Sequence, residues 1–331
     1  MQLNKNIKIF INYFFGPLLF LWLSYSIYRD ILHQPGLQES LLHIKLSIRS
    51  YKVSSLFFAF VLIFINWGLE AWKWKHTIKT IYPISFLSAF RATLSGVAFS
   101  VTMPNRVGEY FGRIMYLPEG KRLKTISVTL VCSFAQLIIT ILAGTAGFLI
   151  MKSTLLQHLS VNLIGYRFAI YGLVCLNLVF LIIYFNVGGT VHLFHNRIRN
   201  KKYLYLIEAL RNFNVRLLIE LLFISFLRYI VFLVQYLLIF YLFDVNIPVG
   251  ITGSIMSIVF LSMAIIPSIA LVEAGVRGKI MISLMGWFTM NTLGVGLTSV
   301  TVWFINLILP AVAGSLLLLN LKVFKKRNEV V

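Results

Sequence analysis

Two short polar stretches of this very apolar chain each carry a glutamate and an arginine at the same spacing. The stretch MPNRVGEYFGR, which begins at Met103, contains Glu109 and Arg113. The stretch PSIALVEAGVRG contains Glu273 and Arg277. Residues four apart lie on one face of a helix, so each glutamate is expected beside its arginine. Charges in a hydrocarbon environment are costly and usually face a polar cavity, so both pairs are candidates for a binding site.

The ionisable residues of these apolar segments include more basic than acidic side chains, and this surplus suits an anionic ligand. A guanidinium group offers paired donors that match phosphate or carboxylate. A proline precedes each pair, so we expect a new helix start there with free amide donors, which attract anions. Our hypothesis is a polar track for a phosphate-bearing headgroup whose tails remain in lipid. The alternative is that the charges only neutralise each other and hold the segments in place.

Two ionisable residues of other apolar segments complete the candidate site. Glu70 in NWGLEAWKWK is expected either to pair with an arginine of the polar stretches or to reach the membrane interface, and both interpretations are open. Arg228 in FLRYIVFLVQY fits a cavity wall or an interhelical hydrogen bond. The residues expected to bind substrate are Arg106, Glu109, Arg113, Glu273, Arg277, Arg228 and Glu70, and those expected to shape the bends are Pro104, Gly108, Pro267 and Gly275.

The elements that position these residues must be membrane helices. The chain has 331 residues, of which 59% are hydrophobic and 12% are charged, and its mean hydropathy is +0.87. These values lie outside the usual range of soluble domains, so we predict an all-α polytopic membrane protein with a single domain over residues 1–331. About 20 apolar residues are needed for a spanning helix. The predicted spans are 10–28, 55–73, 125–150, 167–187, 217–243 and 295–321.

Two further segments are not simple spans. Residues 85–118 and 249–287 each contain an apolar run, a proline and a charged stretch that is too short to cross the bilayer alone. We interpret them as re-entrant hairpins, the first and the second hairpin, each leaving the bilayer on the side where it enters. The more basic loops, among them the one holding Lys73 to Lys79, then lie inside. Both termini are cytoplasmic in this arrangement, and the hairpins enter from opposite sides, as in an inverted repeat.

The net charge of +20 reflects loops that set membrane orientation and attract anionic lipid, so no nucleic acid partner is expected. The expected partners are membrane lipids with anionic headgroups, and a second copy of the chain or a protein of envelope synthesis is a further expectation. No cofactor or metal is expected, because the sequence has no phosphate-binding Gly-rich loop and no paired metal-binding motif. Cys132 and Cys175 lie in separate apolar segments and are interpreted as packing residues.

The stretch MPNRVGEYFGR resembles the first hairpin signature of the lysylphosphatidylglycerol synthase transmembrane family, also called the flippase-like domain family. PSIALVEAGVRG resembles the second hairpin of that family, and WFINLILPAVAG resembles its last helix. The resemblance covers nearly the whole chain and implies a role in moving modified or glycosylated lipids between leaflets. Members that aminoacylate lipid carry a further cytoplasmic synthase domain, whereas this chain ends at VFKKRNEVV, so aminoacylation is not expected.

These observations predict a flippase or transporter that moves an anionic or polyprenyl-phosphate-linked lipid between the leaflets of the bacterial plasma membrane. No ATP-binding loop is present in the sequence, so transport is expected to use a gradient or to run downhill. The alternative is a membrane-embedded enzyme or accessory subunit of envelope lipid or glycan synthesis that uses the same cavity. No catalytic signature supports an enzyme. Such an enzyme would convert its lipid in detergent, where no leaflets exist.

Overall fold

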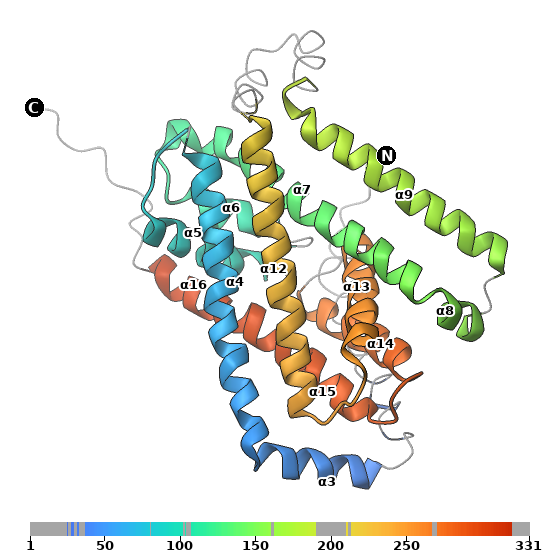
Figure 1. Cartoon of the computed structure of the whole chain (residues 1–331). Coiled ribbons are helices and arrows are strands. Elements are labelled where there is room, and N and C mark those ends of the chain that lie inside the picture. Colours follow the sequence, from blue (N-terminus) through green and yellow to red (C-terminus); the bar gives the residue numbers. More distant parts are fainter. Residues whose placement is uncertain are drawn as a thin grey trace, which may run out of the picture.

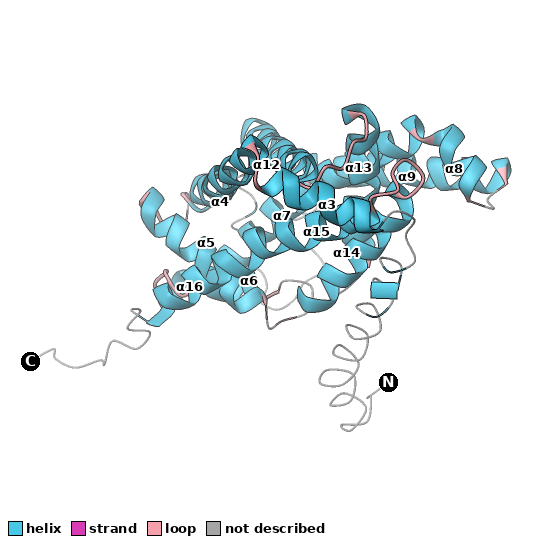
Figure 2. Cartoon of the chain, turned by 90° about the horizontal axis from the view of Figure 1, so that it is seen from below, coloured by secondary structure: helices cyan, strands magenta, loops and turns pink. Residues whose placement is uncertain are grey.

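The computed structural model describes residues 25, 28–29, 32, 37–79, 81–101, 103, 107–159, 162–189, 210, 213–266 and 270–319. Within this part of the chain all regular structure is helical and no strand occurs, as Figure 1 and Figure 2 show. The all-α prediction is therefore confirmed. The predicted first span over residues 10–28 falls almost wholly outside the described residues. Pro104, Arg106 and Pro267 lie outside them too.

Five helical runs are long and apolar enough to cross a membrane. They coincide with five of the six predicted spans, which confirms a multi-pass membrane protein. The last run is interrupted by one π-helical turn, η5, and a side-chain amide of that turn bonds back to the preceding helix. The runs are α4 (Ser54–Ile78), α7 (Glu119–Ile150), α9 (Leu163–Phe185), α12 (Val215–Leu242), and the continuous series α15 (Thr292–Trp303), η5 (Phe304–Ile308) and α16 (Leu309–Leu319).

The first hairpin consists of α5 (Phe86–Ser100) and α6 (Gly108–Ile114). At 1.5 Å per residue, α5 is about 22 Å long, too short to cross a hydrocarbon core of about 30 Å. Glycines let the two arms touch through their backbones. A Cβ atom added at Gly96 would lie 2.7 Å from the carbonyl oxygen of Glu109, and one added at Gly112 would overlap the backbone of Gly96. The arms therefore pack directly on each other.

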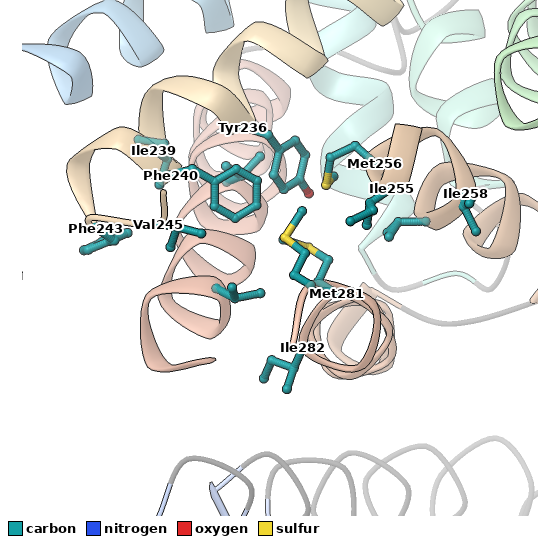
Figure 3. Packing of buried hydrophobic residues seen from close by; sticks show 14 of the residues in the cluster. Tyr236, Ile239, Phe240, Phe243, Val245, Ile255, Met256, Ile258, Met281 and Ile282 are labelled. Carbon is teal, nitrogen blue, oxygen red and sulfur yellow. The ribbon is translucent and has the colours of Figure 1, made fainter. Parts of the chain in front are cut away.

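The second hairpin consists of α13 (Val249–Ile265) and α14 (Ala270–Met285), which pack on each other and, through α14, on α15. Its buried interior is apolar and rich in methionine. Tyr236 of α12 lies among Phe240, Met256 and Met281 in this cluster (Figure 3). The cluster joins α12 to both arms, so it holds the second hairpin against the long spans.

One half of the chain contains α4 and the first hairpin, and the other half contains α12 and the second hairpin. The two halves are packed as an inverted repeat requires. Helices α4 and α12 lie side by side and run in opposite directions (Figure 1). The hairpin that follows each of them therefore begins at the opposite end of the molecule. The first arm of each hairpin packs on the span that follows the other hairpin. In one case Gly314 of α16 meets Leu94 of α5, and in the other Gly147 of α7 meets Ser254 of α13. This reciprocal exchange supports the predicted repeat.

A charged junction lies where α12 ends, close to α3 (Leu37–Ile48) and to the short helix η2 (Tyr51–Val53). Asp244 follows α12 and has φ of 57°. The Nζ atom of Lys52 donates to its Oδ1 atom at 2.7 Å, and Nδ1 of His43 lies 3.5 Å from its Oδ2 atom. Hydrogen bonding from Lys52 holds the pKa of the Asp244 carboxyl below its usual range. These contacts join α3 and η2 to the turn that follows α12.

Replacing Asp244 with asparagine should lower the free energy of unfolding by about 0.2–1 kcal/mol at neutral pH, because partly exposed ion pairs contribute amounts of this order. The folded-state pKa of Asp244 is lowered, so ionisation stabilises the fold above the unfolded pKa of about 4 and this contribution is lost as the pH falls through the folded value. Melting temperatures of the wild type and of Asp244→Asn should differ at both pH 7 and pH 5 and converge only below about pH 4. Convergence already at pH 5 would contradict this assignment.

Candidate functional site

A buried carboxylate on α4 organises the charges of the first half. Glu70 is 6% exposed. Its Oε1 atom accepts from Nη2 of Arg113 on α6 at 2.8 Å. Its Oε2 atom pairs with Nη1 of Arg228 on α12 and lies 2.9 Å from Nζ of Lys73. One carboxylate thus joins a long span of each half to the returning arm of the first hairpin.

Helical spacing and two neighbouring spans fix Arg228 in this cluster. Asn66 lies one turn before Glu70 on α4, and its Oδ1 atom accepts from Nε of Arg228 at 2.9 Å. The Oε1 atom of Gln136 on α7 lies 3.3 Å from Nη1 of the same arginine. The guanidinium group also lies 5.9 Å from the ring centre of Trp67. Arg228 is therefore held in place by groups from both α4 and α7.

Arg113 lies behind the cluster. Its side chain is 2% exposed, and its Nη2 atom also lies 3.2 Å from Oε2 of Glu109. The guanidinium group is 6.0 Å from the ring centre of Trp74. The pair predicted from the four-residue spacing is thus present, and it is joined to Glu70. This arrangement suits Arg113 to positioning the hairpin.

The second pair lies on α14. Nη2 of Arg277 is ion-paired with Oε1 of Glu273, and its Nη1 atom donates to the hydroxyl of Tyr236 at 3.2 Å. Both charged side chains are largely buried, with exposed fractions of 12% for Arg277 and 11% for Glu273. Tyr236 belongs to α12, eight residues after Arg228. Helix α12 therefore contacts Glu70 through Arg228 and Arg277 through Tyr236.

Charges around Glu70 and the Glu273–Arg277 pair line one cavity of about 600 Å³ between the two halves of the chain. Its lining includes amides and hydroxyls as well as charges, and consecutive apolar residues at the end of α13 form an apolar wall. Ile265, at the end of α13, belongs to the apolar wall and is 68% exposed. The polar lining is Glu70, Lys73, Glu109, Tyr110, Ser133, Gln136, Thr140, Arg228, Tyr229, Glu273, Arg277, Trp67, Trp303 and Asn306, and the apolar lining is Leu137, Phe232, Phe260, Met263, Ala264, Ile265, Ile266 and Leu307.

The charges of this site leave a small positive excess. The cavity lining and the side chains directly behind it include four cations, from one lysine and three arginines, and three glutamates. The described residues include no group of three or more His, Cys, Asp or Glu side chains placed to hold a metal ion. A polar, weakly cationic cavity with one apolar wall is suited to bind an amphiphile that carries negative charge.

Residues 40–320 match the family model described as the lysylphosphatidylglycerol synthase TM region. The chain belongs to this family. The match confirms the family that the hairpin motifs resemble, and it links the protein to lipid-related processes in the membrane. The search of curated proteins and the search of solved structures found no match.

Several residues that the sequence predicts for the binding site lie close together in the structure. Of the two interpretations of Glu70, pairing with a hairpin arginine is the one observed. Arg228 and Arg277 line the same cavity, and both hairpin glutamates do so as well. Gly108 lies in the α5–α6 contact, and Gly275 is buried in α14. The roles of these residues in binding a substrate stay predictions.

Lys73 does not lie in an inside loop, and the prediction that placed it there is wrong. Helix α4 continues to Ile78, and Lys73 is 1% exposed and paired with Glu70. The three-residue spacing from Glu70 is a helical signal that identifies such a pair. The predicted span ended too early because the residues after Lys73 are polar, although in the structure they continue the helix.

Proposed function

We propose that the protein moves an anionic or polyprenyl-phosphate-linked lipid between the two leaflets of a bacterial plasma membrane. The observation that carries this proposal is the cavity between the two halves, because charged residues of both hairpins and an apolar wall line it together. A lipid headgroup fits the polar lining while its chains stay beside the apolar residues at the end of α13. Family membership supports a lipid substrate.

The charges of the cavity favour a phosphate. Arg228 and Arg277 line it, and a guanidinium group matches the oxygens of a phosphate with paired donors. The net excess of one positive charge is balanced when a singly charged phosphodiester enters. Binding then removes an electrostatic imbalance that is costly inside a membrane.

The repeat supports movement between leaflets. Two opposed hairpins that meet at one site are the arrangement that many transporters use, in which one half rocks against the other around a fixed site. We propose that both termini lie in the cytoplasm, because this orientation places the more basic loops inside. The first hairpin then faces the cytoplasm and the second faces the outside.

Replacing Arg277 with glutamine should slow transport about tenfold or more, because a hydrogen bond to a charged group contributes about 1.5–3 kcal/mol. The purified protein is reconstituted into vesicles that contain a fluorescent phosphatidylglycerol, and leaflet-selective quenching measures its movement. Arg91→Gln is the matched control, because Arg91 is an exposed charge of the first hairpin outside the cavity lining.

Wild-type rates equal to those of protein-free vesicles would overturn the proposed function. Chemical conversion of a labelled lipid in detergent would favour a membrane-embedded enzyme instead. Equal losses in Arg277→Gln and Arg91→Gln would show that general damage to the hairpins, rather than the cavity, explains the effect. Size-exclusion profiles of both variants check that each is folded.

A further inference from the structure

We propose that the headgroup bound in the cavity combines a phosphate with hydroxyl groups, such as those of glycerol or a sugar, and carries no amine. This inference rests on the proposed function and names the substrate class of the same site. It follows from which groups of the cavity are already paired and which still need a partner. The family name refers to an aminoacylated lipid, so the inference separates this chain from that substrate.

The carboxylates that line the cavity are not free to bind an amine. Every one that the structure describes is already paired with a cation of the protein. Glu70 has three cationic partners, and Glu109 and Glu273 each pair with the arginine four residues later. A carboxylate is the side chain that best compensates the charge of a ligand ammonium in this interior, and taking one of these would leave a buried protein charge uncompensated, which is strongly destabilising. The positive excess of the site further disfavours an amine.

Two hydrogen-bond donors of the cavity-lining residues indicate which ligand atoms the site needs. The indole Nε1 of Trp67 and the Nε of Arg277 are buried without a hydrogen-bond partner among the described residues, and both residues line the cavity. Both groups can only donate. A buried donor without an acceptor is costly, so oxygen atoms are expected from whatever enters. Phosphate and hydroxyl oxygens supply them.

One hydrogen-bond acceptor of the cavity lining indicates that the ligand also carries a donor. The Nδ2 atom of Asn306 donates to the carbonyl of Val302 at 3.1 Å, which fixes the amide within the π-helical turn. Its Oδ1 atom is buried and has no partner in the part of the chain that the structure describes, and Asn306 lines the cavity. A phosphodiester has no proton to donate. Since the charges disfavour an amine, a hydroxyl group is the donor that fits.

The size of the cavity agrees with such a headgroup. A volume of about 600 Å³ lies within the range of small-molecule sites, which is roughly 300–1,000 Å³. The apolar wall, with Phe232 and Phe260 of neighbouring helices, remains for the first carbons of the acyl chains. The site therefore offers separate contacts to a phosphate, to hydroxyls and to hydrocarbon.

The main test compares two lipids with the same acyl chains in vesicles that contain the full-length protein. Labelled phosphatidylglycerol should move about tenfold faster or more than labelled lysylphosphatidylglycerol, since each 1.4 kcal/mol of preference is tenfold. Equal or faster movement of the lysylated lipid overturns the inference and leaves the proposed function standing. If neither lipid moves, the proposed function fails, and binding in detergent decides the inference alone.

The binding test uses quenching of tryptophan fluorescence by short-chain lipids. Phosphatidylglycerol should bind about tenfold more tightly than lysylphosphatidylglycerol, and the opposite order overturns the inference. Free glycerol 3-phosphate is the competitor that separates a lipid site from a site for a soluble phosphate. Competition at equal concentration would assign the site to the soluble compound and overturn the lipid headgroup as ligand.

Two substitutions test the unpaired groups directly. Trp67→Phe removes the indole N–H and should weaken phosphatidylglycerol binding about fivefold to tenfold, whereas Trp72→Phe on the exposed side of α4 should not. Asn306→Leu should abolish the preference for phosphatidylglycerol over phosphatidylethanol, a phosphodiester without a hydroxyl. An unchanged preference in Asn306→Leu would overturn the assigned hydroxyl contact. Quenching in the Trp variants is followed with an acyl-chain probe, because the substitutions alter tryptophan emission.

Discussion

Glu70→Gln should prevent most of the protein from accumulating in a folded, monodisperse form. The substitution keeps the shape of the side chain but removes the charge that faces Arg113, Arg228 and Lys73. Breaking a buried ion pair by removing one partner costs about 3–5 kcal/mol. Whole domains are stable by only about 5–15 kcal/mol. The yield of monodisperse protein in detergent and its melting temperature measure the effect.

A matched control is Glu220→Gln on α12. Glu220 is 44% exposed and lies 3.4 Å from Nε of Arg216, so its loss should change the unfolding free energy by about 0.5 kcal/mol or less. In the Glu70→Gln background, a second change Lys73→Met should recover part of the loss, because it removes one of the cations left without a partner. A Glu70→Gln protein that melts like the wild type would contradict the central role of this carboxylate.

Local patterns predicted much of this fold and part of the site. Hydropathy over about 20 residues identifies spans such as α9 and α12 without reference to the rest of the chain. Helical spacing likewise predicted that Glu109 lies beside Arg113 and Glu273 beside Arg277, and both pairs are present. Each of these predictions depends on residues within a few turns of one another.

Contacts between distant segments were not predictable in the same way. Glu70 meets Arg228 across 158 positions of sequence, and no local signal chooses this partner over another arginine. Lys73 was misassigned because polar residues after it concealed the continuing helix. The close approach of α5 and α6 shows how packing decides such partners. Glycines on the two arms let the backbones touch, and Arg113 reaches Glu70 from the arm so placed.

The dependence of the site on backbone contact predicts a second large effect, at Gly112. A Cβ atom here would overlap Cα and N of Gly96 and the carbonyl carbon of Ser95. These are backbone atoms of another helix and cannot rotate away, so the two arms must separate. Overpacking typically costs about 1–3 kcal/mol. Gly112→Ala should reach the upper part of this range, and Gly112→Leu should give little folded protein.

Measuring both the melting temperature and the transport rate distinguishes a loss of packing from a loss of function at this contact. Gly172→Ala is the control, because Gly172 lies inside α9 and a Cβ atom there meets nothing within 4 Å. Since Arg113 is the residue next to Gly112, separation of the arms should also draw its guanidinium group away from Glu70. In the vesicle assay of the proposed function, the Gly112→Ala protein that remains folded should therefore give a lower rate than Gly172→Ala. Equal stability and equal transport in the two variants would show that the arms of the first hairpin do not need backbone contact to position the charges.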